Sequence, residues 1–269
     1  MLPFTKAHAY GNDFLYVQNR DLTRPDRAEA ARRLCDRHRG VGADGLILYT
    51  ITPRGANMSL LNADGSPAEL SGNGLRALAA ILVRAREASG GPFDPDLEIQ
   101  TTSGLRRLRL EGKEGSLYVF EADMGQPEGI RQVTIAAAGE SITATVVSIG
   151  NPHLVVLGPL PDDERFACVG PALERHSDFP QRTNVEFALV ESPERVRIRI
   201  WERGVGPTES SGTGSCAAAV AAAIHGGAAR RVEVHAPGGS QTVHWTEQGV
   251  RLTGWAEILC DGTFTAHWP

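Results

Sequence analysis

Two serines stand in nearly identical glycine-rich segments, Ser71–Gly74 and Ser211–Gly214, and each segment runs into an alanine-rich stretch with a helical pattern. Serine is a favoured residue at helix N-caps. The unpaired N–H groups of a helix N-terminus, together with the positive end of the helix dipole, bind carboxylate or phosphate. The two segments therefore predict two helix N-termini, one from each half of the chain, that face each other across a single anion-binding site.

The serines could cap the helices or act in catalysis, and the spacing alone favours capping. Neither serine lies in a Gly-x-Ser-x-Gly segment, so the nucleophile of an α/β-hydrolase is not indicated. His153 is a candidate base, although a single histidine is more often a hydrogen-bonded structural residue. The pair Glu202-Arg203 beside the second serine is either a surface ion pair or part of the site.

Uncharged amides recur around both segments. Asparagine offers donors and acceptors without charge, so a cluster of asparagines could hold the ammonium and the carboxylate of an amino acid together. The candidates are Asn12, Asn62, Asn73, Asn151 and Asn184.

The similarity of the two halves extends well beyond the serine segments, which are 140 residues apart. Gly11–Val17 aligns with Gly150–Val156, and Asp44–Leu48 aligns with Asn184–Ala188 at nearly the same offset. Several matches in the same order at a nearly constant offset indicate an internal duplication. The sequence therefore predicts two domains, 1–115 together with 258–269, and 116–257.

Short apolar or β-branched runs bounded by turn residues predict a chain dominated by strands. One long helix should follow each serine segment, over 75–82 and 216–224, and shorter helices are expected over Arg27–Arg37 and Pro171–His176. The fold class expected is α/β, with two pseudo-symmetric domains, each a curved and mostly antiparallel sheet around a central helix. The predicted strands are Leu15–Gln18, Gly45–Ile51, Asn57–Asn62, Leu105–Leu110, Leu117–Glu121, Thr143–Ser148, Leu154–Leu157, Val185–Val190, Val196–Trp201 and Val232–His235.

Composition narrows the class of protein. The formal net charge is −5 and no basic block stands out, so neither nucleic acid nor a membrane surface is expected as a partner. The longest apolar run, Cys216–Ile224, is too short to cross a bilayer. The four cysteines are widely spaced and indicate neither a metal site nor a disulfide framework, which fits a cytoplasmic location. A phosphate- or nucleotide-binding module is a weaker alternative. The glycine-rich segments lack the Lys-Ser/Thr pair of a P-loop and the acidic residue that follows the glycines of a dinucleotide-binding fold.

The chain resembles the diaminopimelate epimerase family over nearly its whole length. The segments that carry this resemblance are Gly11–Phe14, Cys35–His38, Gly42–Gly45, Asn62–Ser66, Gly72–Gly74, Gly150–His153, Asn184-Val185, Glu202–Gly204 and Gly212–Gly214. The resemblance implies two similar α/β domains, a site between them, and no pyridoxal or other cofactor. It also implies interconversion of L,L- and meso-diaminopimelate by transfer of the α-proton between two residues, as a step of lysine biosynthesis. A homodimer is common in the family.

The resemblance also assigns roles to individual residues. Ser71 and Ser211 occupy the two catalytic positions, and His153 and Glu202 match residues that lie beside them and polarise them. The positions that match substrate contacts are Asn12, Gly45, Asn62, Gly72, Asn73, Asn151, Asn184, Glu202, Arg203, Gly212 and Thr213. No metal ligand is implied.

The chain departs from the family at the two catalytic positions, where the family carries cysteine and this chain carries Ser71 and Ser211. A thiol titrates near ~8.5 and lower at a helix N-terminus, whereas a serine hydroxyl is a far weaker acid. We therefore expect substrate binding with slow or absent turnover. Two explanations stay open at this point: an engineered double substitution in a true epimerase, or a natural relative that binds an amino acid only or catalyses another isomerisation. Pro207 is a further, smaller departure in the turn before the second serine.

Overall fold

The computed structural model describes residues 1–22, 26–68, 71–90 and 94–265. The chain forms two compact units. Unit 1 contains Met1–Ala122 and the segment that begins at Gly254, and unit 2 is Asp123–Thr253. Both divisions fall within strands, since β8 (Leu117–Gly125) and β17 (Gly249–Phe264) each contribute residues to both units. The predicted C-terminal return segment, 258–269, ends in four residues that lie outside the described ranges.

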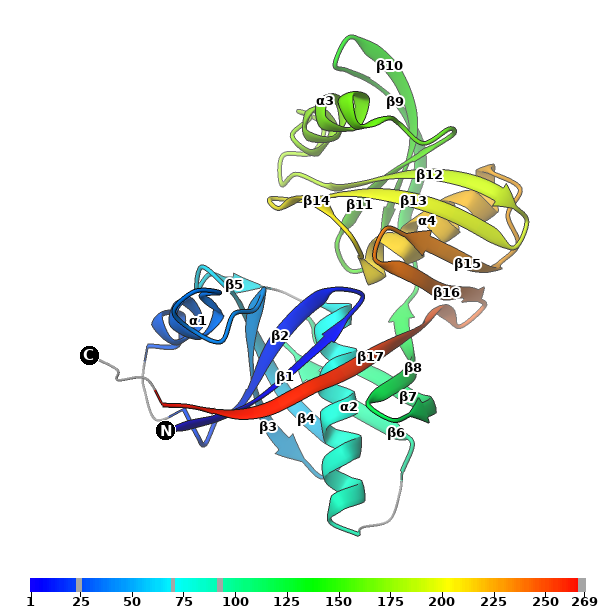
Figure 1. Ribbon diagram of the computed structural model, residues 1–269. Helices are drawn as coiled ribbons and strands as arrows, with labels where there is room; N and C mark the ends of the chain where they lie inside the picture. Colours follow the sequence, from blue (N-terminus) through cyan, green and yellow to red (C-terminus); the bar gives the residue numbers. More distant parts are fainter. Residues whose placement is uncertain (23–25, 69–70, 91–93, 266–269) are drawn as a thin grey trace. The chain divides into compact units, whose positions relative to one another are not determined.

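Unit 1 is one sheet with two helices, α1 (Arg27–Cys35) and α2 (Gly72–Ala88) (Figure 1). Its strands pair in the order β17-β1-β2-β3-β4-β6-β7-β8, and the short β5 pairs with the end of β4. The β2–β3 and β4–β6 pairs are parallel and the others in this order are antiparallel. The strands not yet given bounds are β1 (Leu2–Ala9), β2 (Asn12–Gln18), β3 (Gly45–Thr52), β4 (Gly55–Asn62), β5 (Pro67–Ala68), β6 (Asp96–Thr101) and β7 (Gly104–Glu114).

Unit 2 repeats this topology. Its strands pair in the order β9-β10-β11-β12-β13-β15-β16-β17, and β14 pairs with the end of β13. The parallel pairs, β11–β12 and β13–β15, stand at the same places in this order as β2–β3 and β4–β6 in unit 1. Helices α3 (Asp163–Glu174) and α4 (Gly212–His225) take the places of α1 and α2. The predicted α/β fold with two similar, mostly antiparallel domains is confirmed. The strands are β9 (Glu128–Ala137), β10 (Glu140–Ser148), β11 (Pro152–Leu157), β12 (Asn184–Ser192), β13 (Arg195–Glu202), β14 (Gly206–Thr208), β15 (Arg231–Ala236) and β16 (Gly239–Thr246).

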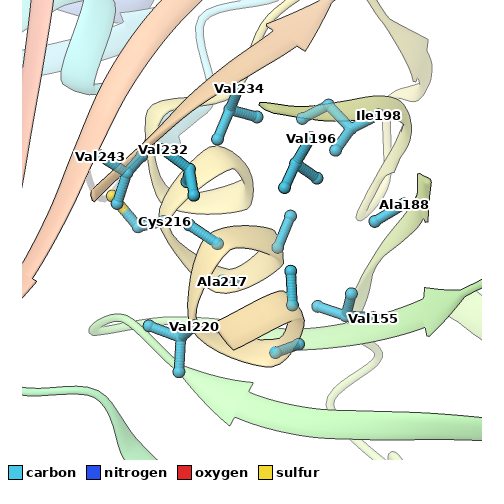
Figure 2. Packing of buried hydrophobic residues seen from close by; sticks show 14 of the residues in the cluster. Val155, Ala188, Val196, Ile198, Cys216, Ala217, Val220, Val232, Val234 and Val243 are labelled. Carbon is cyan, nitrogen blue, oxygen red and sulfur yellow. The ribbon is translucent and has the colours of Figure 1, made fainter. Parts of the chain in front are cut away.

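Helix α4 is the centre of the core of unit 2. Its residues Cys216–Ala222 are buried on every face, because strands β10 to β13, β15 and β16 all contact it. Figure 2 shows valine and isoleucine side chains from the surrounding strands converging on the small side chains of Cys216 and Ala217. Alanines let the helix lie close to the sheet, and β-branched residues on the strands fill the remaining space. The helix N-terminus is thereby held rigidly at one end of the core.

Strand register corrects the alignment of the two halves by one residue. In unit 1 Phe14 pairs with Gly45, and in unit 2 His153, the counterpart of Phe14, pairs with Asn184. Gly45, and not Asp44, therefore corresponds to Asn184. The apolar pattern could not distinguish these two alignments, because residues along both strands are buried on both faces.

The helix expected over Pro171–His176 was placed too late in the chain. Helix α3 begins at Asp163, where the side chain of Asp162 accepts a hydrogen bond from the N–H of Arg165 at 2.8 Å. Pro171 lies in the last turn rather than at the start. The N-cap and two acidic residues of the first turn outweigh the proline as a signal for where the helix begins. The other short helix, α1, lies within the predicted range Arg27–Arg37.

No helix among the described residues is both long enough and apolar enough to cross a membrane.

Two candidate half-sites

Both serines cap their helices, with closely matching geometry. Ser71 Oγ accepts a hydrogen bond of 3.0 Å from the N–H of Gly74, and Ser211 Oγ accepts one of 3.0 Å from Gly214. Both serines have extended backbones, with φ and ψ of −126° and 118° at Ser71 and −138° and 123° at Ser211. Each hydroxyl therefore lies at the positive end of a long, buried helix. We call the surroundings of Ser71 the first half-site and those of Ser211 the second.

The second half-site contains a chain of polar side chains that ends at Ser211. His153 Nδ1 lies 2.8 Å from Glu186 Oε1, and His153 Nε2 lies 2.9 Å from Asn151 Oδ1. Asn151 Nδ2 donates to Thr213 Oγ1 at 3.4 Å, and Thr213 Oγ1 lies 3.5 Å from Ser211 Oγ. Strand β11 supplies His153, β12 supplies Glu186 and the first turn of α4 supplies Thr213. The structure thus joins three of the predicted site residues to Ser211.

Asn184 and the turn after β13 form the other side of the second half-site. Asn184 Nδ2 donates to the carbonyl of Pro152 at 2.9 Å, and its Oδ1 accepts from the N–H of Arg203 at 3.0 Å. Asn184 therefore ties the turn that contains Glu202 and Arg203 to strand β11. Burial is the largest cause that raises the pKa of Glu202, and the charge of Glu186 raises it further. A protonated Glu202 could donate a hydrogen bond to a ligand carboxylate or a proton to a reacting atom.

Glu174 is a residue of this region that the sequence analysis missed. Its side chain is 2 % exposed, and its Oε1 accepts from the N–H of Gly204 at 2.9 Å, next to Arg203. Arg182 Nη1 lies 3.5 Å from the same oxygen. Glu174 therefore fixes the turn that carries Glu202 and Arg203. The sequence of this short segment does not reveal that Glu174 is buried, so it gave no signal for this role.

The first half-site is built differently around the same helix start. The Tyr16 hydroxyl donates to the carbonyl of Gly74 at 3.0 Å. Asn73 is buried and its Oδ1 accepts from Arg76 Nη2 at 2.5 Å, so this amide oxygen is held by the protein. Asn62 Nδ2 donates to Ser66 Oγ at 3.0 Å. Asn12 Oδ1 is buried and has no hydrogen-bond partner among the described residues, which is the pattern of a group that awaits a ligand.

A charged network holds the strand ends of the first half-site in place. Asp13 lies 2.9 Å from both Lys6 Nζ and Arg37 Nη2, and Arg37 also reaches Asp44 at 2.8 Å. Burial alone would raise the pKa of Asp13, but the hydrogen bonds from Arg37 and Lys6 outweigh burial and lower it. The network fixes the start of β2, next to Asn12, against the loop before Gly45. Asp13, Arg37 and Asp44 belong to the segments that carry the family resemblance, and their contacts here position neighbouring residues.

The remaining predicted contacts, Gly72 and Gly212, are the first residues of α2 and α4. No group of three or more potential metal-ligating side chains occurs in the described ranges.

Solved structures with a similar fold include two named as epimerases. One is a predicted epimerase from Pseudomonas aeruginosa, with a TM-score of 0.75 and 17 % identity, covering 99 % of this chain and 100 % of that one. Another is a hydroxyproline epimerase from Agrobacterium vitis, with a TM-score of 0.68 and 16 % identity, covering 97 % and 91 %. The two duplicated units thus have the fold that these epimerases share.

Sequence comparison narrows this class to one family. The family model described as diaminopimelate epimerase matches residues 4–130 and 145–259. The diaminopimelate epimerase of Desulforudis audaxviator is 43 % identical, covering 97 % of this chain and 98 % of the relative, and that of Desulfitobacterium hafniense is 37 % identical, covering 97 % of both. The chain belongs to the diaminopimelate epimerase family and is an epimerase of the cofactor-independent class.

Proposed function

We propose that the two half-sites together bind one molecule of diaminopimelate, with Ser71 and Ser211 on opposite faces of its α-carbon. The reaction of the scaffold is the interconversion of L,L- and meso-diaminopimelate, in lysine biosynthesis in the cytoplasm. One residue removes the α-proton while the other delivers a proton to the opposite face. We further propose that the protein works without pyridoxal phosphate, and that it forms a homodimer, as is common in the family.

The observation that carries this proposal is the matched pair of serine-capped helix N-termini. Each helix offers unpaired N–H groups of its first turn, and the glycines at 72, 74, 212 and 214 let a ligand approach the backbone closely. Two such termini suit an α-carboxylate gripped from both sides. Asn12, with its buried and unpartnered amide oxygen, is a candidate acceptor for the α-ammonium group.

Serine at both catalytic positions limits the rate. A side-chain hydroxyl must ionise before it can remove an α-proton, and each pK unit of mismatch between base and carbon acid costs about 1.4 kcal/mol. A thiol at a helix N-terminus ionises readily near neutral pH, whereas a serine hydroxyl in the same place stays protonated. We therefore propose that this chain binds diaminopimelate and epimerises it very slowly or not at all.

Hydrogen exchange at the α-carbon tests the proposal. L,L-diaminopimelate is incubated in heavy water with the unsubstituted protein and with the variant Ser71→Cys/Ser211→Cys, and α-deuterium is followed by NMR or mass spectrometry. The account predicts binding by both proteins, measured by calorimetry, and rapid deuterium incorporation by the double variant alone. A double variant that binds the amino acid yet incorporates no deuterium at the α-carbon would contradict the proposal. The single variants Ser71→Cys and Ser211→Cys are the matched controls, because each restores one of the two positions.

A second candidate function is binding without epimerisation. The geometry that favours it is the good fit of both hydroxyls as caps, since each accepts a hydrogen bond at 3.0 Å. A natural protein with these serines could serve as an amino-acid sensor or carrier, or catalyse another isomerisation. Tight binding of diaminopimelate, together with no exchange in any cysteine variant, would favour this function over the first.

A further inference from the structure

Glu186 and His153 form a buried pair. The sequence predicted His153 as a site residue, but it did not predict Glu186 as its partner. Both side chains are fully buried, and Glu186 Oε1 lies 2.8 Å from His153 Nδ1. Glu186 Oε2 has no hydrogen-bond partner among the described residues. A buried carboxylate is costly unless its charge is matched, so the protonation of this pair is constrained.

Hydrogen-bond counting shows how many protons the pair must hold. Asn151 uses its Nδ2 to donate to Thr213, so its acceptor atom Oδ1 faces His153 Nε2, and Nε2 must carry a proton. On the other side of the ring, Nδ1 faces a carboxylate oxygen, and that hydrogen bond needs a second proton. The second proton lies on the imidazole or on the carboxyl group. In either arrangement the pair is neutral as a whole, which makes its complete burial tolerable.

The first half-site has apolar residues at the two corresponding positions. Phe14 occupies the place of His153, since the two residues stand at matching positions in the repeated β2–β3 and β11–β12 pairs. In the same register Ile47 occupies the place of Glu186. A methyl group built on Gly74 would lie 2.7 Å from Ile47 Cδ1, and one on Gly214 would lie 2.6 Å from Glu186 Oε1. Glu186 therefore packs against the first turn of α4 as Ile47 packs against the first turn of α2.

The two half-sites are thus alike in backbone and unlike in chemistry. From Glu186 the polar contacts continue through His153 and Asn151 to Thr213 and Ser211. A methyl group built on Gly214, which would contact Glu186 Oε1, would also lie 3.1 Å from Ser211 Oγ, so Glu186 and Ser211 lie close to the same point of the helix start. These contacts link the pair to residue 211, and the first half-site has no counterpart of this pair at 14 and 47.

We propose that Glu186 is a positioning residue of the second half-site. It holds one proton jointly with His153, and it thereby keeps His153 Nε2–H directed at Asn151, which fixes Thr213 against residue 211. The second half-site is the half in which a buried pair of polar side chains supports the residue at 211. The assignment of a catalytic benefit rests on the proposed function, whereas the shared proton does not.

Proton NMR of the unsubstituted protein tests the shared proton. A proton in a short hydrogen bond between imidazole and carboxylate resonates far downfield, and burial of the pair protects it from exchange. We expect one such resonance, lost in Glu186→Gln, because an amide can still donate to Nδ1 but does not form this type of hydrogen bond. Glu174→Gln is the matched control, since Glu174 is also a buried glutamate of unit 2, and it should keep the resonance. A resonance that persists in Glu186→Gln, or that is missing from the folded unsubstituted protein, would overturn the proposal.

Kinetics in the Ser71→Cys/Ser211→Cys protein test the positioning role. Glu186→Gln preserves side-chain size, so we expect kcat for L,L-diaminopimelate to fall about 10- to 100-fold with KM nearly unchanged. If Glu186→Gln does not fold, Glu186→Asp serves as the second variant: it keeps the carboxyl group but moves it away from the ring, and kcat should again fall. An unchanged kcat in a folded variant that has lost the NMR signal would refute the positioning role. Absence of exchange in the cysteine-containing parent would refute the proposed function, and the NMR result would still decide whether the pair shares a proton.

Discussion

A methyl group added at the third residue of each long helix should affect the two units very differently. Gly74→Ala and Gly214→Ala are equivalent substitutions, because each glycine donates its N–H to the capping serine. At Gly74 the new methyl group meets Ile47 Cδ1, the end of a flexible side chain. At Gly214 it meets Glu186 Oε1, which is fixed by its hydrogen bond to His153.

The magnitudes follow from what must move. Alanine in place of glycine stabilises a helix by up to about 1 kcal/mol. In unit 1 this gain is offset by an off-rotamer shift of Ile47, which costs about 0.5–1.5 kcal/mol, so the net change is near zero. In unit 2 the carboxylate must leave its buried partner, and a broken buried pair costs about 3–5 kcal/mol. We therefore expect Gly214→Ala to lower the free energy of unfolding by about 2–4 kcal/mol.

Thermal unfolding followed by calorimetry or circular dichroism measures the difference. For a domain of this size about 1 kcal/mol corresponds to about 3 °C, so Gly214→Ala should lower Tm by about 6–12 °C and Gly74→Ala by far less. In the double variant Gly214→Ala/Glu186→Ala the new methyl group has room. Adding Gly214→Ala to the Glu186→Ala variant should therefore lower Tm by less than adding it to the unsubstituted protein. Equal losses for the two single alanine variants would refute the assignment of different surroundings to the two helix starts.

Three further predictions concern caps, pH and thiols. Ser71→Ala and Ser211→Ala should each lower the free energy of unfolding by about 1 kcal/mol in urea titrations, because each removes one cap, and the two losses should add. The pKa of Glu202 is higher in the folded protein than its value of 4.5 in the unfolded chain. The contribution of this group to the free energy of unfolding is therefore fully present below pH 4.5 and is lost as pH rises through the folded pKa. Glutamine does not titrate, so the free energy of unfolding of Glu202→Gln should increase relative to that of the unsubstituted protein as pH rises above 4.5. Burial raises the pKa of Cys35 to about 12, so a thiol reagent at pH 8 should modify the exposed cysteines and leave Cys35 unmodified until the protein unfolds.

The duplication made most of the fold predictable from the sequence. Both serine caps, both long helices and the repeated strand–turn–helix order were visible, because glycine-rich turns and periodic apolar residues act locally. Strands such as β9 (Glu128–Ala137) and β17 (Gly249–Phe264) were not predicted. Their exposed faces carry charged and polar residues, and their pairing with distant strands overrides a weak local preference.

The site was predictable where a residue type has a fixed backbone role, and less so where burial decides. The caps at Ser71 and Ser211 follow from local chemistry. The pairing of Glu186 with His153 depends on two neighbouring parallel strands, so no spacing along the chain reveals it. A glutamate within an apolar run at Val185–Val190 was a signal that could have been used, since a charged side chain in a buried strand needs a partner.

A crystal structure of this protein with bound diaminopimelate tests the central claim most directly, and serine at both proposed catalytic positions favours a stable complex. We expect one ligand molecule, with Ser71 Oγ and Ser211 Oγ each about 3–3.5 Å from its α-carbon and on opposite faces. A ligand that contacts one of the two serines while the other faces a separate pocket would contradict the account.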